Sequence, residues 1–392
     1  MNEVPPKWIP NYIPTSLSRH FARIHYADVK EATLPELQLL SQQPIVSLTV
    51  SMTGSTDEHD VCFKNMKKLK TLNLEVPEVS GPLMQNLSTL PDLEQLILRT
   101  GQVDPKSLRH LQNLKNLTSL SLGEFEDGGE VLRAAAKLPR LKFLELHVKT
   151  LESDAIAMIG DCPQLITLIL SADKSRSQRI SQAFVAKFEQ QSSLMGVGLS
   201  GRGITDEVLA CAALAVNLKS FSLNDSVITG KSADQIAKLI NLESLNLSHT
   251  VIPVEIVKSL SDLSNLNQLD LSNASVPDEV MQHFPAIENL SDLNLSNTSI
   301  TDESLRKLLH LNNLETFILS NTSITDGALT ELSRMPSLRF LEVEGVAGIT
   351  DASAMALCDL KKLQKLNVRN TGISKVGIQQ MINREAIPHI LY

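Results

Sequence analysis

The chain has few cysteines, and this limits the classes of protein to which it can belong. Its four cysteines, Cys62, Cys162, Cys211 and Cys358, are far apart in 392 residues and form no paired framework. Small secreted domains commonly use closely paired cysteines, and so do extracellular proteins whose end caps are held together by disulfide bonds. The sequence therefore favours a reducing compartment.

Excess positive charge and long apolar runs are also missing. The net charge is −8 and the pI is about 5.7, which disfavours nucleic acid and anionic membranes as partners. No run of eighteen apolar residues is present, so we expect no membrane association through a spanning helix. The opening residues, MNEVPPKWIPNYIP, lack the apolar stretch of a cleavable secretory signal. We expect a cytoplasmic protein, and export by a route without such a signal is the alternative.

Recognisable catalytic motifs are absent as well. The sequence holds no phosphate-binding loop, no nucleophile elbow and no paired-cysteine metal site, so we expect no enzyme, no cofactor and no metal. The densest polar group is Asp57, Glu58, His59 and Asp60. We interpret it as the exposed first turn of a helix, where acidic side chains complement the helix dipole. A divalent metal site at these residues is the alternative.

What the chain does have is a repeat. The pattern Leu-x-x-Leu-x-Leu recurs every 24 residues, with intervals of 29 residues after Leu165 and 25 residues after Leu338. A fixed period of this size predicts a stacked solenoid. The fourteen copies begin at Ile45, Leu69, Leu93, Leu117, Leu141, Leu165, Leu194, Leu218, Leu242, Leu266, Leu290, Leu314, Leu338 and Leu363.

Each copy predicts one strand and one helix. The alternation in Leu293-x-Leu295 has period two and indicates a short strand, which a polar turn over residues 296–299 ends. Leucines spaced three and four apart from Leu305 indicate a helix, and Asp302 is its predicted N-cap. The same Thr-Asp pair occurs before four other helices, at residues 56–57, 205–206, 325–326 and 350–351.

Stacked copies bury the apolar faces that one copy leaves open. The pattern resembles the leucine-rich repeat proteins, especially bacterial ones with 24-residue repeats similar to the ribonuclease-inhibitor-like class. The resemblance covers residues 44–390. It implies an α/β horseshoe of about 14 repeats, with parallel strands on the concave face and helices on the convex face.

One position departs from the family pattern. After the strand, where the family has asparagine or cysteine, this chain often has threonine, as at Thr250, Thr298 and Thr322. In the N-terminal half the position is filled by Pro77, Gly101, Phe125 and Lys149, and we expect less regular turns there.

The two ends and one long copy complete the expected organisation. Residues 1–43 are predicted to form an N-terminal helical cap, with a helix over about 14–32, and residues 44–392 the solenoid, capped from about residue 382. Alternatively, residues 1–43 dock a partner, because Ile13-Pro14, Leu17, Phe21, Ile24 and Asp28-Val29 faintly resemble the start of an F-box. The longer copy at 165–193 predicts a longer convex helix with a basic, solvated face, or else a local docking site.

The predicted function is protein–protein recognition by a monomeric scaffold of bacterial type. We expect an unidentified protein partner on the concave face, where large apolar residues interrupt a polar surface. The alternative is a bacterial effector that recruits host proteins through residues 1–43. The candidate partner-binding residues are Ile97, Phe143, Glu145, His147, Ile166 and Ile169 in one stretch and Ile318, Phe340 and Glu342 in another. Between the stretches, residues 244–296 are mostly serine, asparagine and aspartate and read as scaffold.

Overall fold

The chain forms two compact units, Met1–Leu194 and Met195–Tyr392. The computed structural model describes residues 25–54, 57–103, 105–152, 157–176, 193–201, 204, 206, 209–210, 215 and 217–392. No helix in these ranges is both long and apolar enough to cross a membrane.

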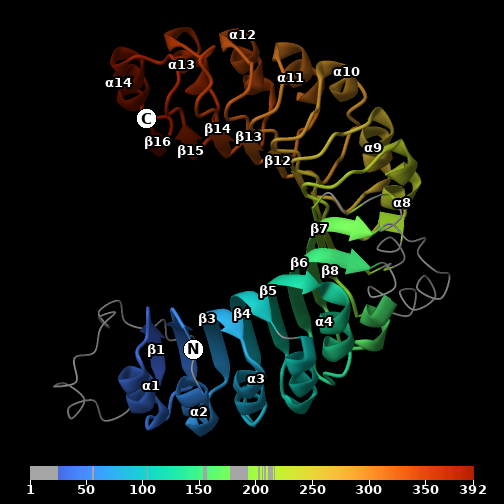
Figure 1. Ribbon diagram of the computed structural model, residues 1–392. Helices are drawn as coiled ribbons and strands as arrows, with labels where there is room; N and C mark the ends of the chain where they lie inside the picture. The colour runs from blue at the N-terminus through green and yellow to red at the C-terminus, as the bar shows by residue number, and fades with distance from the viewer. Residues whose placement is uncertain are drawn as a thin grey trace. The chain divides into compact units, whose positions relative to one another are not determined.

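The first unit alternates strands with α- or 3₁₀-helices, and its strands pair in parallel in chain order (Figure 1). Its described elements are β1 (Tyr26–Val29), α1 (Leu34–Ser41), β2 (Ser47–Ser51), α2 (Asp57–Asn65), β3 (Thr71–Val79), α3 (Gly81–Leu87), β4 (Gln95–Val103), η2 (Pro105–Asn113), β5 (Ser119–Asp127), α4 (Gly128–Ala135), β6 (Phe143–Glu152), η3 (Ala157–Asp161) and β7 (Thr167–Arg176).

The second unit repeats the plan with shorter strands, again parallel and in chain order. Its described elements are β8 (Gly196–Ser200), β9 (Ser220–Ser222), η4 (Gly230–Ser232), α8 (Ala233–Ala237), β10 (Ser244–Asn246), α9 (Val254–Ser259), η5 (Leu260–Asp262), β11 (Gln268–Asp270), α10 (Asp278–Met281), β12 (Asp292–Asn294), α11 (Asp302–Leu308), β13 (Thr316–Ile318), α12 (Asp326–Leu329), η6 (Thr330–Arg334), β14 (Phe340–Glu342), α13 (Asp351–Leu357), β15 (Lys365–Asn367), α14 (Lys375–Asn383) and β16 (His389–Leu391).

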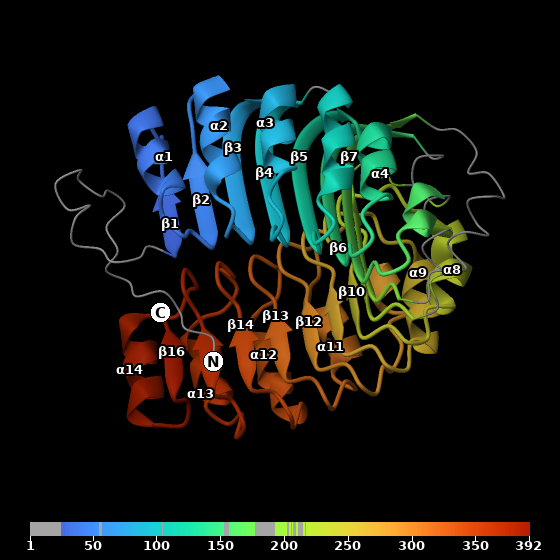
Figure 2. The same ribbon diagram turned by 90° about the horizontal axis from the view of Figure 1, so that it is seen from below.

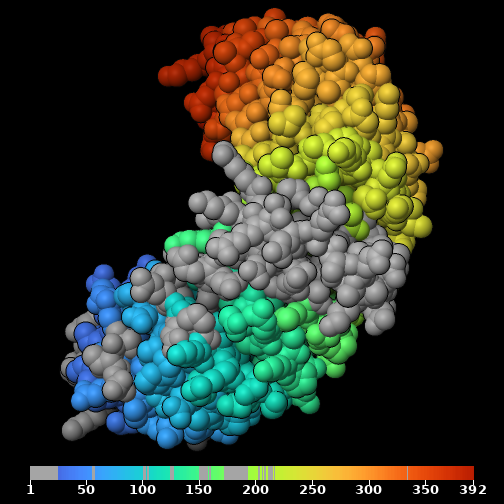
Figure 3. Space-filling model, turned by 45° about the vertical axis from the view of Figure 1, so that its right-hand side comes forward, coloured from blue at the N-terminus to red at the C-terminus, as the bar shows by residue number. Residues whose placement is uncertain are grey.

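The repeated leucines form the core between strands and helices. Leu245, Leu269 and Leu293 lie in register on β10, β11 and β12 and are almost completely buried. Within each unit the helices lie on one side of the strands (Figure 2). Each repeat packs against the repeats before and after it. Figure 3 shows this order as a gradual change of colour along each unit. The predicted strand-and-helix copy is confirmed.

The two units differ at the residue seven places after the first leucine of each copy. In the second unit this residue has a positive φ in every copy, and the eight residues are Gly201, Asp225, His249, Asn273, Asn297, Asn321, Gly345 and Asn370. Glycine, asparagine, aspartate and histidine tolerate this left-handed conformation best. At Gly345 a Cβ atom would also collide with Oδ1 of Asn321. The left-handed residue lies in the turn that follows each strand.

The first unit lacks such residues. Its equivalents in β3 to β7 are Val76, Thr100, Glu124, Val148 and Ala172, and none has a positive φ. β-Branched and apolar residues resist the left-handed conformation, so the chain stays extended. The expected turns at Pro77, Gly101, Phe125 and Lys149 are strand instead, because these four residues lie inside strands of nine or ten residues. The expected irregularity is present at Phe125, since the pairing of β5 with β6 shifts register between Leu122 and Phe125.

The threonines that follow these left-handed residues close the turn. The hydroxyl of Thr298 donates to the carbonyl oxygen of Leu295 at 2.6 Å, and that of Thr322 to Leu319 at 2.7 Å. Thr371 repeats the bond with Val368 at 2.7 Å. Threonine thus provides a local hydrogen bond where the family pattern has asparagine or cysteine.

The left-handed position gives a test of this account. Replacing Asn297 with valine is expected to destabilise the protein by about 1–2 kcal/mol more than replacing it with glycine. Of these two replacement residues, only glycine adopts a φ near 57° without strain. Both replacements remove the hydrogen bond from Nδ2 of Asn321 to Oδ1 of Asn297, so the loss of this bond does not contribute to the difference between the two variants. Urea unfolding of the two variants measures the difference. Equal stabilities would contradict the role given to the backbone conformation.

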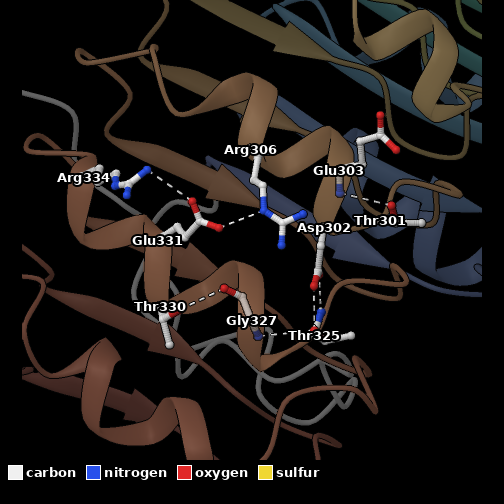
Figure 4. A network of polar contacts seen from close by, with 9 residues as sticks. All are labelled: Thr301, Asp302, Glu303, Arg306, Thr325, Gly327, Thr330, Glu331 and Arg334. Carbon is white, nitrogen blue, oxygen red and sulfur yellow. Dashed lines mark hydrogen bonds and ion pairs between the residues drawn. The ribbon is translucent and has the colours of Figure 1, made fainter.

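The helix starts correct a second expectation. Thr301, not Asp302, is the N-cap of α11, because its hydroxyl accepts the amide of Glu303. Asp302 lies in the first turn and reaches the next repeat, where it accepts the amide and the hydroxyl of Thr325, each at 2.7 Å (Figure 4). Thr325 in turn caps α12. The aspartate therefore joins two repeats, while the threonine before it caps the helix.

This Asp–Thr bridge recurs along the second unit. Oxygens of each aspartate accept hydrogen bonds from the cap residue of the following repeat, and we call the series the aspartate ladder. Its members are Asp206 with Thr229 and Ser232, Asp278 with Thr301 and Ser304, Asp302 with Thr325, Asp326 with Thr350, and Asp351 with Ser374. Beside it, Glu331 accepts Arg306 at 2.8 Å and Arg334 at 3.3 Å (Figure 4).

Both ends of the described chain extend the sheet. The expected helix over 14–32 is wrong for its described part, because residues 26–29 form β1, which pairs with β2. Asp28 and Val29 of the F-box-like pattern lie in this strand, and the rest of that pattern lies outside the described residues. At the other end, β16 pairs with β15. Weak copies of the repeat, Ile24-x-x-Ala27-x-Val29 and Ile387-x-x-Ile390, account for both strands.

The described cysteines belong to the core. Cys62, Cys162 and Cys358 are buried. Burial raises the pKa of the Cys162 thiol to about 12 and also raises that of Cys62 and Cys358. These residues are therefore protonated thiols at neutral pH and have low nucleophilicity. Cys211 and most of the longer copy, including Arg179 and Lys187, lie outside the described residues.

Candidate functional site

The side of the strands that faces away from the helices carries the variable residues. Two positions of each strand point to it, one before and one after the central buried residue, and strand pairing aligns them into two rows. In the second unit the first row is Ser220, Ser244, Gln268, Asp292, Thr316, Phe340 and Lys365, and the second row is Ser222, Asn246, Asp270, Asn294, Ile318, Glu342 and Asn367.

In the first unit, the structure brings four of the candidate residues together. Phe143, Glu145 and His147 lie on β6, and Ile169 is the register partner of Glu145 on β7. Glu145 accepts the hydroxyl of Ser121 at 2.6 Å, and its other oxygen lies 3.3 Å from Nε2 of His147. Phe143 and Ile169 are half-buried, so part of each apolar side chain remains open to water.

Ile97 and Ile166 lie apart from this cluster. Ile97 shares the row of Glu145 and Ile169, but it is on β4, two strands away from β6. Strands are about 4.8 Å apart, so Ile97 lies roughly 10 Å from Glu145. Ile166 precedes β7 and is 37% exposed beside the strand start, where its amide donates to Lys142. The surface therefore has one compact cluster and two outlying apolar residues.

The second stretch of candidates also falls on adjacent strands. Ile318 on β13 and Glu342 on β14 are register partners in the second row. Phe340 also lies on β14, in the first row, two residues before Glu342. The ammonium of Lys365 lies 4.9 Å from the centre of the Phe340 ring, a cation–π contact. Glu342 accepts the hydroxyl of Ser320 at 2.9 Å. Phe340 and Ile318 are half-buried.

A hollow lies between residues that the sequence led us to interpret as scaffold. It has a volume of about 320 Å³ and extends over β10 to β13. Its lining side chains are Ser244, Leu245, Asn246, Gln268, Leu269, Asp270, Asp292, Leu293, Asn294, Thr316 and Ile318. The band of small polar residues leaves space there, because serine and asparagine fill less volume than the residues that flank them. Small side chains at consecutive positions of the two rows were the sequence signal that could have predicted this hollow.

The polar groups of the hollow are positioned by their own turns. Oδ1 of Asp270 accepts the amide of Ser272 at 2.9 Å, and Asn246 and Asn294 accept Ser248 and Ser296 in the same way. Asp292 accepts the hydroxyl of Ser291 at 2.6 Å. These short bonds fix the side chains in place before any ligand arrives, which lowers the entropic cost of binding.

The acidic group at residues 57–60 is arranged differently from the expectation. Asp60 is only 2% exposed, although an exposed first turn was predicted, because it faces the next repeat. There it accepts the hydroxyl of Ser80, the N-cap of α3, at 3.0 Å. Across the described ranges, no group of three or more His, Cys, Asp or Glu side chains is arranged to hold a metal ion.

Comparisons with known proteins agree with this geometry. The family model described as "Leucine-rich repeat region" matches residues 216–389. No curated protein matches the chain significantly. An internalin structure from Listeria monocytogenes is similar, with 20% identity, coverage of 86% of this chain and 88% of that chain, and a TM-score of 0.56.

A leucine-rich repeat protein from Leptospira interrogans is similar to the same degree. Its sequence is 19% identical, the match covers 98% of this chain and 93% of that chain, and the TM-score is 0.55. At these identities the likeness concerns the fold. The matched family model, the shared fold and the 24-residue period together support a leucine-rich repeat protein.

Proposed function

We propose that the chain is a non-catalytic module that binds a protein partner through the strand face opposite the helices. Folds of this kind commonly serve protein–protein interaction. The proposal includes a monomeric scaffold in the cytoplasm of a bacterium, where buried thiols remain reduced. It involves neither nucleic acid nor a membrane surface, in keeping with the net charge of −8.

One observation carries the proposal. Phe143 and Ile169 place large apolar side chains on a strand face whose other positions are mostly small and polar, and both stay partly open to water. Residues of this kind are the usual anchors of a binding surface, surrounded by polar groups that exclude water. Glu145 and His147 beside them offer polar contacts at the rim of the anchor.

The test is to capture partners from host lysate with the intact protein and to measure their affinity for a Phe143→Asp variant. The affinity should fall by about thirtyfold or more, as expected for loss of an interfacial anchor. Val61→Asp is the matched control, since Val61 is 50% exposed on α2 and lies on the helix side. It should bind normally.

Thermal unfolding of both variants separates loss of binding from loss of fold. A partner that binds Phe143→Asp and the parent protein equally would overturn the proposed face. If that partner were then lost on deletion of residues 1–24, the alternative of an effector that docks through its N-terminal segment would replace it.

A further inference from the structure

The lining of the hollow in the second unit carries negative charge. Its lining includes Asp270 and Asp292 and no basic side chain. The register neighbours of Asp270 are Asn246 and Asn294, and those of Asp292 are Gln268 and Thr316. Asp270 accepts the amide of Ser272 in the turn after its strand, Asp292 accepts the hydroxyl of Ser291, and both carboxylates have further acceptor capacity.

An apolar side chain follows each carboxylate at the same interval. In the first row, Asp292 is followed by Thr316 and then Phe340. In the second row, Asp270 is followed by Asn294 and then Ile318. Both rows therefore read acidic, polar, apolar. Two strand spacings of about 4.8 Å separate the charge from the apolar group, roughly 10 Å in all.

We infer that this face binds an extended protein segment that carries a lysine or arginine and, three residues away, a large apolar residue. The inference rests on the proposed function and specifies its partner. A segment in the polyproline II conformation has three residues per turn and advances about 3.1 Å per residue, so side chains three residues apart point to the same side at about 9 Å, close to the 10 Å interval. The basic group enters the hollow between Asp270 and Asp292, and the apolar group packs on Ile318 and Phe340.

The charge beyond the apolar pair fixes the order of the segment. Lys365 lies over Phe340 on the strand that follows it. A basic group placed over the Phe340 ring would be repelled by Lys365, while Asp270 and Asp292 attract it at the opposite end; Glu342 nearby already accepts the hydroxyl of Ser320. The segment therefore lies with its basic residue toward β11 and β12 and its apolar residue toward β14. The hollow is wide enough for a guanidinium, and arginine can contact two carboxylates at once.

The experiment is a selection from a displayed random dodecapeptide library on the full-length protein, followed by affinity measurements on synthetic copies of the enriched peptides. The test variant is Asp270→Asn with Asp292→Asn. Asparagine already occupies the position of Asp270 in neighbouring repeats, at Asn246 and Asn294, so the fold should persist. The matched control is Glu279→Gln with Glu288→Gln, which removes the same charge from exposed sites of the same unit.

Enriched peptides should share a basic residue three places from a large apolar one, and should bind the test variant at least about tenfold more weakly than the parent or the control. Replacing the basic residue of the peptide with alanine should have the same effect. Peptides without a shared basic residue that bind Phe143→Asp more weakly than the parent would overturn this inference and leave the proposed function intact. Peptides indifferent to every strand-face variant, or no enrichment, would overturn both.

Discussion

Replacing Leu245 with alanine is expected to lower the free energy of unfolding by about 2–5 kcal/mol. The side chain is 1% exposed and lies in register between Phe221 of β9 and Leu269 of β11. Shortening it removes apolar contact area and leaves a cavity that neighbouring strands cannot fill without shifting. Urea unfolding followed by circular dichroism gives the change directly.

The control is Ile240→Ala in the preceding repeat. Ile240 is 56% exposed, so its truncation creates no cavity and should change stability by less than about 0.5 kcal/mol. Equal effects at the two positions would contradict the assignment of the strand leucines to the core. A repeat contacts only its neighbours, so hydrogen exchange should increase first next to Leu245.

The second large effect concerns the aspartate ladder. Asp278→Ala is expected to destabilise the protein by about 1–2 kcal/mol at neutral pH, because the amide and hydroxyl of Thr301 and the hydroxyl of Ser304 all lose their acceptor. Ser304 is buried and has no easy access to water in its place. The estimate is modest because the carboxylate itself is partly exposed.

The aspartate ladder also makes the free energy of unfolding depend on pH. Burial alone would raise the pKa of Asp278, but hydrogen bonds from Ser304 and Thr301 outweigh it and lower the pKa below 3.8; Asp206 and Asp326 are lowered in the same way. A pKa that is lower in the folded state means that the stabilisation is fully present above pH 3.8. It is lost as the pH falls from 3.8 through the folded value.

Unfolding of the parent protein and Asp278→Ala between pH 7 and pH 2.5 tests both statements. The difference between the two should be constant from pH 7 to about pH 5 and shrink below pH 3.8, as the parent becomes protonated. Asp262→Ala is the control, since Asp262 is exposed in the same unit. A difference that stays the same down to pH 2.5 would show that the charge of Asp278 does not contribute.

The period and the leucines were sufficient to predict the fold. Spacing alone predicted parallel strands, helices opposite them and the alignment of the two rows, because a fixed repeat puts equivalent residues in register. The N-caps were misplaced by one residue. Thr301 and Asp302 are both good capping residues, and only the position of Thr325 in the next repeat decides which one faces the amides of its own helix.

The functional surface was harder to predict. Large residues such as Phe143 and Phe340 are visible in the sequence, but a hollow is made by several small residues on four strands. The long strands of the first unit escaped notice for a related reason. The decisive position holds Val76 or Val148 there and Asn297 or Asn321 in the second unit, and it lies one residue before the position at which the chain departs from the family pattern.

The aspartate ladder bears on how such a chain changes length. At four successive junctions from Asp278 to Ser374, a carboxylate of one repeat accepts the amide and the hydroxyl of the capping residue of the next repeat. The four junctions therefore share this pair of bonds. A complete repeat can be duplicated or deleted within this segment, and the new neighbours still find matching donors and acceptors. The length of the strand face can change by whole repeats while each junction keeps this pair of bonds.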